Sequence, residues 1–111
     1  MNKDTDVFLK HVLESIEHIE DYTRGKSEKE FLKAVETQDA VMRRLAVVGE
    51  AAKNIPEALR NKHSSIDWKA IIGLKNVLVH EYFGVDMKII WQIVKKDMPS
   101  LKSEIVKMLK E

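Results

Sequence analysis

Hydrophobic and polar residues follow one another along this chain with the three- and four-residue spacing of amphipathic helices. The first such segment runs from about Asp4 to Tyr22, and its apolar positions include Phe8, Val12, Ile16, Ile19 and Tyr22. Asp4 or Thr5 can cap the start of this helix, and Gly25 suits the left-handed residue that often ends one. The pattern therefore predicts a first helix that buries one face.

A second, longer helix is predicted from Ser27 to about Asn54. Ser27 and Glu30 have the spacing of a capping box, and a stripe follows them at Phe31, Val35, Gln38, Met42, Leu45 and Gly49. The second half of the helix is small and apolar nearly all round, which is typical of a segment buried on more than one side. Glycine inside a helix costs about 1 kcal/mol relative to alanine, so Gly49 predicts a close packing contact.

Pro56 can sit at the first turn of a short helix from Glu57 to Arg60, and two more helical regions complete the pattern. Asp67 is placed to cap a helix from Trp68 to about Phe83, and Asp86 to cap the next helix. Pro99 interrupts this last apolar pattern, so we expect a kink or a restart just before it. The predicted fold class is all-α, an antiparallel four- to five-helix up-and-down bundle, formed by a single domain over residues 1–111.

Composition limits the function classes. The chain has no cysteine, which excludes disulfides, thiolate metal sites and cysteine nucleophiles and suits a reducing cytoplasm. No apolar run approaches the about 20 residues that span a bilayer, so we expect a cytoplasmic protein without a membrane partner. The net charge of +1 gives no bulk attraction to nucleic acid, and any such binding needs a local patch. Arg43 and Arg44 could line a path for phosphates.

The stretch from Gly73 to Tyr82 combines a cation, an amide, a histidine, a carboxylate and a phenol with apolar residues. Polar clusters in apolar surroundings are where chemistry tends to be found. At about 100° per residue, Asn76 and His80 share one face of the predicted helix, and Lys75 and Tyr82 share another. Lys75 and His80 lie about 140° apart around the axis. A joint site therefore needs either a helix that loosens near His80 or two copies of the helix.

The apolar residues of this helix favour two copies. One stripe consists of Ile71, Leu74 and Leu78, and a second of Ile72, Val79 and Phe83. One stripe can face the core and the other a partner subunit, which predicts a homodimer. In a plainer interpretation, His80 is a core histidine that hydrogen-bonds to Asn76, while Lys75 reaches solvent and Tyr82 lies in an interface. No metal or cofactor site is expected, since the other histidines lack a third ligand at a suitable spacing.

The run from Lys75 to Tyr82, Lys-Asn-Val-Leu-Val-His-Glu-Tyr, closely resembles the signature of HEPN-domain proteins. More narrowly, it resembles that of HepT-like toxins paired with minimal nucleotidyltransferase (MNT) antitoxins. Other segments that resemble the family are Val48–Lys53, Ile66–Ile71, Tyr82–Asp86 and Trp91–Ile93. The resemblance covers nearly the whole chain. It implies a helical bundle, a homodimer, and metal-independent cleavage of RNA at the dimer interface.

By position, the resemblance implies that His80 is the catalytic histidine and that Asn76 orients it. Tyr82 matches the tyrosine that the MNT partner adenylylates. Lys75 holds the position of the family's arginine, and it keeps the charge but lacks the planar two-point grip on phosphate. The implied function is the toxin of a type VII-like HEPN/MNT toxin–antitoxin pair, an endoribonuclease neutralised by adenylylation. The alternative is a catalytically weakened HEPN protein that binds or regulates a minimal nucleotidyltransferase.

Overall fold

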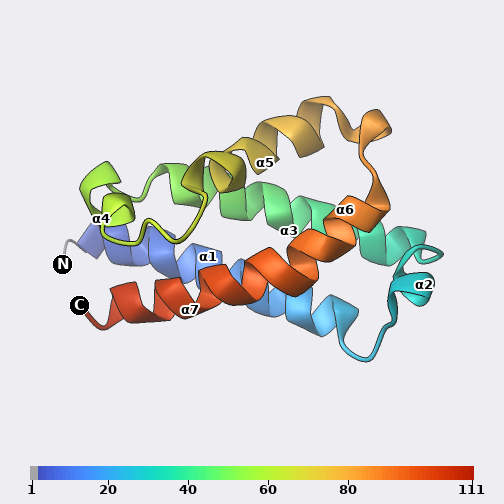
Figure 1. Cartoon of the computed structure of the whole chain (residues 1–111), viewed down its shortest axis with the longest axis horizontal. Coiled ribbons are helices and arrows are strands. Elements are labelled where there is room, and N and C mark those ends of the chain that lie inside the picture. The colour runs from blue at the N-terminus through green and yellow to red at the C-terminus, as the bar shows by residue number, and fades with distance from the viewer. Residues whose placement is uncertain (1–2) are drawn as a thin grey trace.

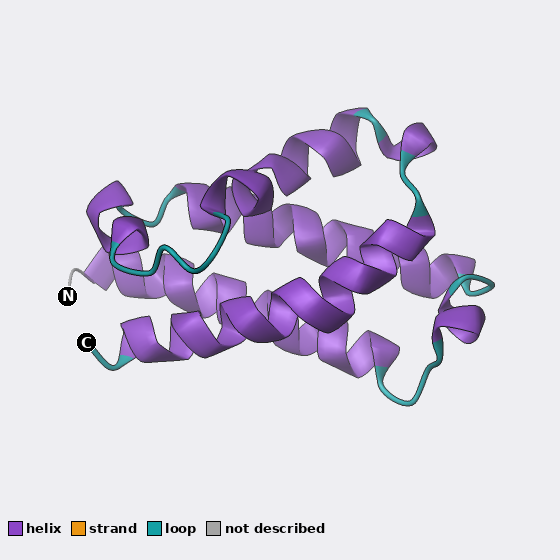
Figure 2. Cartoon of the chain, in the orientation of Figure 1, coloured by secondary structure: helices purple, strands orange, loops and turns teal. Residues whose placement is uncertain are grey.

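The computed structural model describes residues 3–111, and all regular secondary structure within them is helical. The elements are α1 (Lys3–Thr23), α2 (Glu28–Phe31), α3 (Val35–Lys53), α4 (Glu57–Asn61), α5 (Trp68–His80), the 3₁₀ turn η1 (Tyr82–Gly84), α6 (Met87–Gln92), the π-helical turn η2 (Ile93–Asp97) and α7 (Met98–Leu109). Short loops join them (Figure 2). The all-α prediction is confirmed.

The long helices form an antiparallel bundle (Figure 1). α3 packs against α1 on one side and α5 on the other, and α7 packs along α1. α6, η2 and α7 follow one another as one bent rod. An ion pair between Lys102 of α7 and Glu20 of α1, with Nζ and Oε1 2.9 Å apart, joins the start of one helix to the end of the other. The beginning of α1 and the end of α7 therefore lie at the same end of the bundle. Between residues 3 and 111, no helix is both long and apolar enough to cross a membrane.

The predicted face of the first helix is confirmed, because its apolar stripe is fully buried at Leu9, Val12, Ile16 and Ile19. Its predicted cap is wrong. α1 begins by Lys3, so Asp4 and Thr5 lie inside the helix, and the residues before Lys3 lie outside the described range. Asp4 and Asp6 instead place negative charge in the first turn, which the helix dipole favours. Gly25 has the expected left-handed conformation, with φ of +75°.

The prediction of one helix from Ser27 to Asn54 is wrong. The Ser27–Glu30 capping box forms as expected, but α2 ends at Phe31 and α3 begins only at Val35. The break turns the Phe31 ring into the core, where it lies 5.1 Å from the Trp91 ring, centroid to centroid. The side-chain amide of Gln38 donates to the Phe31 carbonyl at 2.9 Å and so satisfies the broken end.

The helix predicted from Trp68 to Phe83 is shorter than expected. Its cap is confirmed, since the Asp67 carboxylate accepts from the Ala70 amide at 3.1 Å, but α5 ends at His80 and is followed by η1. The chain turns there because Val85 packs against the core and Asp86 caps α6, accepting from the Lys88 amide at 2.8 Å. Only the last three residues of the predicted helix are affected, and they include Tyr82.

The expected irregularity before Pro99 is confirmed as the π-helical turn η2. Proline has no amide hydrogen and crowds the carbonyl one turn earlier. The helix accommodates Pro99 by widening into a π-helical turn, in which the Met98 amide donates to the carbonyl of Ile93, five residues earlier. Within the same stretch, the Lys95 ammonium lies 4.7 Å from the centre of the Trp91 ring.

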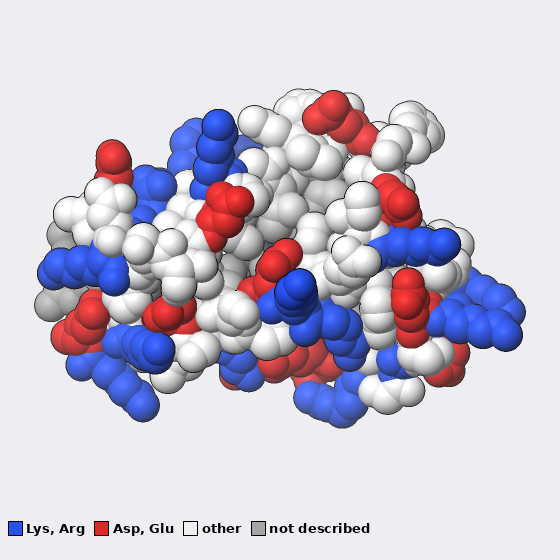
Figure 3. Space-filling view, viewed as in Figure 1, with Lys and Arg blue, Asp and Glu red and all other residues white. Residues whose placement is uncertain are grey.

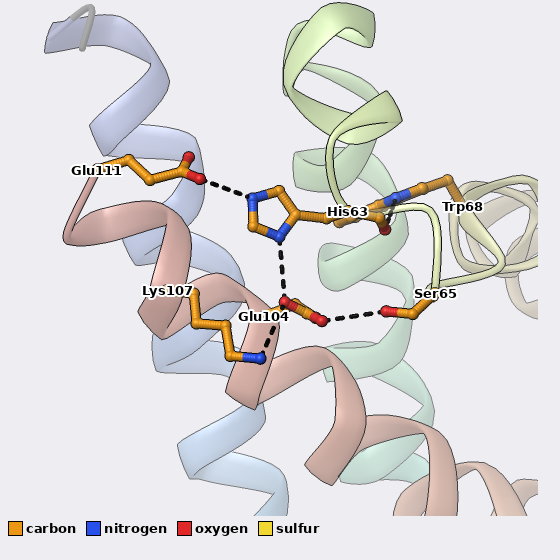
Figure 4. A network of polar contacts seen from close by, with 6 residues as sticks. All are labelled: His63, Ser65, Trp68, Glu104, Lys107 and Glu111. Carbon is orange, nitrogen blue, oxygen red and sulfur yellow. Dashed lines mark hydrogen bonds and ion pairs between the residues drawn. The ribbon is translucent and has the colours of Figure 1, made fainter.

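A polar network fixes the loop between α4 and α5 to α7 (Figure 4). The two ring nitrogens of His63 lie 3.1 Å from a carboxylate oxygen of Glu104 and 3.1 Å from one of Glu111. The Ser65 hydroxyl donates to the other Glu104 oxygen at 3.0 Å, and the Trp68 indole donates to the His63 carbonyl at 3.0 Å. This loop leads directly into α5, so the network helps to fix where α5 begins.

The hydrogen bond from His63, followed by that from Ser65, lowers the pKa of Glu104 below its ordinary value of 4.5. A carboxylate with a lowered folded-state pKa stabilises the fold above its unfolded pKa, and this contribution is lost as pH falls through the folded value. We therefore expect the free energy of unfolding to fall below about pH 4.5, with a smaller fall in Glu104→Gln. Urea denaturation at a series of pH values measures it. Exposed Glu17→Gln is the control, and an equal pH dependence in Glu104→Gln and the unmodified chain would contradict the assignment.

Candidate functional site

The candidate site begins at the closest approach of α3 and α5. A Cβ atom added at Gly49 would lie 2.8 Å from the Ile71 carbonyl oxygen and 3.0 Å from the Lys75 amide nitrogen. Both atoms belong to the backbone of α5, so neither can move aside without moving the helix. The packing role predicted for Gly49 is confirmed, and its contact fixes where the Lys75 backbone lies against α3.

Lys75 pairs with a carboxylate of α3. Its Nζ lies 3.0 Å from Oε2 of Glu50, and both side chains are about half exposed. The hydrogen bond and charge of Lys75 lower the pKa of the Glu50 carboxyl. Glu50 belongs to the segment Val48–Lys53 that resembles the family, but no pattern in the sequence predicts a role for it. The cation of the predicted site is thus held by a side chain that lies 25 positions earlier in the sequence.

Asn76 and His80 lie on the face of α5 that points away from the core. Both are exposed, and neither side chain hydrogen-bonds to another residue of the described range 3–111. Gly73 is on the same side, and a Cβ there would meet no atom within 4 Å. The interpretation of His80 as a core histidine satisfied by Asn76 is therefore wrong for this chain. An imidazole and an amide side by side in open space remain free to contact a ligand or a second protein.

Tyr82 lies beyond the end of α5, in η1. Its predicted position on the same helical face as Lys75 is wrong, because the α-helical register ends at His80. Tyr82 is 51% exposed, and its ring lies against that of Phe83, with the centroids 4.2 Å apart and the ring planes tilted by 31°. The phenol is thus accessible at the end of the helix that carries Asn76 and His80.

One copy of α5 does not bring Lys75 and His80 together. The helix is regular from Lys75 to His80, which leaves the two side chains about 140° apart around its axis. The sequence left two ways of forming a joint site, a helix that loosens before His80 or two copies of the helix. The structure does not show the first. The core stripe of α5 is buried as predicted, at Ile71, Leu74 and Leu78.

Several apolar side chains near the end of α5 face solvent. Those exposed by more than a third are Val77, Val79, Tyr82, Phe83 and Ile89, and Phe83 reaches 90%. In Figure 3, the surface over the end of α5 is largely uncharged apart from acidic side chains, whereas blue and red mix over the rest of this face. Exposed apolar surface of this kind commonly marks a site of interaction.

The sequence profile of the family described as "Ribonuclease HepT-like" matches residues 12–108, most of the chain. The chain belongs to the HepT-like ribonuclease family. This confirms the family resemblance carried by the run from Lys75 to Tyr82. No solved structure gives a significant match.

Relatives whose names include a ribonuclease match nearly the whole of this chain. A Methanocaldococcus jannaschii protein named "Gamma-glutamylcyclotransferase and putative RNase MJ0434" is 47% identical over 111 residues, which cover the whole of this chain and 50% of the relative. The chain thus spans half the length of that protein. "Probable ribonuclease HepT" of Thermococcus cleftensis is 42% identical over 93% of this chain and 94% of its own length. "Putative RNase TTE0752" of Caldanaerobacter subterraneus is 38% identical, with 94% and 93% covered.

Proposed function

We propose that this HepT-like chain is a metal-independent endoribonuclease whose active site forms between two copies. The observation that carries the proposal is the pair Asn76 and His80, exposed on α5 with no partner among residues 3–111. Family membership and the relatives named as ribonucleases support it.

The proposed chemistry uses the substrate's own 2′-hydroxyl, a group that DNA lacks. His80 removes the 2′-hydroxyl proton as the 2′-oxygen attacks the phosphorus, and the bond to the 5′-oxygen breaks. The products are a 2′,3′-cyclic phosphate and a 5′-hydroxyl, whose oxygen takes a proton from water, while His80 releases the proton it removed to solvent. Lys75 stabilises the charge that develops on the phosphate oxygens, and Asn76 orients the His80 ring. No step needs a metal ion.

The composite site requires a homodimer, with the exposed apolar residues around Val79 and Phe83 in the interface. Burying them would remove apolar surface from water and would let Lys75 of one copy approach His80 of the other. Light scattering at micromolar concentration tests this part of the proposal. A stable monomer that still cleaves RNA would rule out the composite site.

The proposed biological role is that of a toxin restrained by an MNT-type nucleotidyltransferase antitoxin. The antitoxin would transfer AMP from ATP to the Tyr82 hydroxyl, releasing pyrophosphate. The 51% exposure of the Tyr82 side chain supports access by such an enzyme. The added phosphate and base would repel and displace RNA phosphates. Mass spectrometry after co-expression tests it: neutralisation without an AMP mass on the Tyr82 peptide would leave masking by the partner as the cause.

A second candidate function is favoured by one observation. The cation at the family's arginine position is a lysine, and it is already engaged by Glu50 at 3.0 Å. Such a chain could be a catalytically weakened HEPN protein that binds or regulates a minimal nucleotidyltransferase. Cleavage by the unmodified chain distinguishes the two functions.

Lys75→Arg is expected to raise the rate of RNA cleavage, because a guanidinium restores two-point contact with the phosphate. The measurement is the initial rate on single-stranded RNA in the presence of EDTA, with the end group identified as a cyclic phosphate. Lys69→Arg, the same change six residues earlier on α5, is the control and should leave the rate unchanged. A rate that falls in Lys75→Arg, or that depends on added magnesium, would contradict the proposed role.

A further inference from the structure

A pocket with a volume of about 340 Å³ lies between α1, α3 and α5. Its walls include Phe8, His11, Arg43, Glu50, Lys75 and Val79. The volume lies near the lower end of the range of roughly 300–1,000 Å³ that is typical of small-ligand sites. Apolar and charged side chains from three helices meet in it, which suits a ligand with one flat apolar part and one anionic part.

The charges of the pocket favour an anion. Arg43 and Lys75 contribute two cations against the single carboxylate of Glu50. Arg43 is exposed and forms no ion pair with any residue from 3 to 111. Its guanidinium is therefore available for the two-point contact with phosphate that arginine makes well. Arg43 and Glu50 are seven positions apart on α3, so they lie on one face about two turns apart.

We propose that this pocket binds one nucleotide of the RNA strand, with a phosphate held by Arg43 and Lys75 and the base against the ring of Phe8. The proposal rests on the ribonuclease function proposed above and adds the place where the strand lies. Base stacking on an aromatic ring tolerates any sequence. With a net charge of only +1 on the whole chain, a local pair of cations is the kind of patch that RNA binding requires.

In this arrangement, Glu50 competes with the RNA phosphate for the ammonium group of Lys75. Its carboxylate occupies Lys75 in the free protein, with Nζ and Oε2 3.0 Å apart. A phosphate that binds must take the place of that carboxylate or share the ammonium with it. The Gly49 contact fixes the Lys75 backbone against α3, so the exchange involves side chains and not a movement of α5. Glu50 thus lowers the affinity for RNA and is a positioning residue for Lys75.

The test measures binding of a short fluorescent single-stranded RNA by anisotropy, in a His80→Ala background that prevents cleavage. Arg43→Ala should weaken binding about tenfold, the loss of one charge-assisted contact, and should make binding less sensitive to salt. Glu50→Gln should tighten it. Arg44→Ala is the matched control, since it removes the same charge from the next position of α3, which does not line the pocket. Circular dichroism checks that each variant folds.

Each outcome decides the proposal. Equal weakening by Arg43→Ala and Arg44→Ala would reduce RNA binding to general charge and overturn the pocket. Weaker binding in Glu50→Gln would overturn the competition. Free AMP is the second probe: binding of AMP that depends on Arg43 while RNA binding does not would assign the pocket to free nucleotides and reject the RNA strand.

Failure of this inference can be told apart from failure of the ribonuclease. If His80→Ala abolishes cleavage but Arg43→Ala behaves as Arg44→Ala in both binding and KM, the ribonuclease stands and the pocket does not. If the unmodified chain cleaves no RNA but RNA binding depends on Arg43 and tightens in Glu50→Gln, the pocket stands as a binding site and the ribonuclease does not.

Discussion

Replacing His80 by alanine is expected to abolish RNA cleavage, with kcat falling on the order of 10²–10⁴-fold, the usual contribution of a general acid–base residue. The imidazole is the group proposed to take the 2′-hydroxyl proton, and a methyl group cannot do so. The change should leave the fold intact, because the His80 side chain is exposed and forms no hydrogen bond to residues 3–111. Single-turnover cleavage of RNA measures the rate directly.

The control for this experiment is His18→Ala, which makes the same chemical change on α1. The His18 ring stacks near Tyr22, with centroids 6.1 Å apart, and lies outside the candidate site. Its loss should not change kcat. Cleavage that persists in His80→Ala at the unmodified rate would remove His80 from the mechanism and, with it, the proposed active site.

Phe31→Ala is expected to lower the free energy of unfolding by about 3–5 kcal/mol, the range seen when a buried aromatic ring is deleted. The Phe31 side chain is fully buried, and its ring contacts that of Trp91. Removing the ring leaves a cavity between α2 and α6. It also removes the contact with Trp91 that favours the helix break after Phe31. Urea denaturation with a linear extrapolation gives the change.

Val35→Ala is the informative comparison, since the sequence pattern puts Phe31 and Val35 on one apolar stripe of one helix. In the structure Val35 is 64% exposed, so its truncation should change stability by no more than about 0.5 kcal/mol. Comparable losses in both variants would mean that the helix continues through residues 32–34 in solution.

The features of the fold that could be predicted from sequence are those set by neighbouring residues. Ser27, Asp67 and Asp86 accept backbone amides two or three positions later, and all three were identified as caps. The widened turn before Pro99 follows from the chemistry of proline itself. The three- and four-residue spacing of apolar residues predicted the buried faces of α1 and α5, because the core covers each helix on one side only.

The two wrong helix boundaries have a tertiary cause. Residues 32–34 contain no glycine or proline, so no local signal marks the break after Phe31. Its cause is Trp91, 60 positions later, which the Phe31 ring contacts. Likewise, α5 ends at His80 because Val85 must reach the core, and the propensities of residues 81–83 do not reveal that.

In the candidate site, too, some features are set by neighbouring residues and others by tertiary contacts. Helical periodicity placed Asn76 and His80 together and Lys75 apart from them, as the structure has them. The Glu50 partner of Lys75 could not be predicted, since it depends on where α3 and α5 cross. The Gly49 contact determines that crossing. The arrangement of two copies depends on a surface that one chain leaves exposed, so neither the sequence pattern nor the single chain specifies it.

The position of the first and last helical turns determines where a tag or a further domain can be attached. The first turn of α1 and the last turn of α7 lie at one end of the bundle, while η1 lies toward the other (Figure 1). Chain ends that lie close together usually tolerate circular permutation and the fusion of further domains. A tag, surface tether or fused domain attached beyond Leu109 would therefore extend away from Tyr82, so immobilised or fused forms of this chain can present the end of α5 to a second copy in solution.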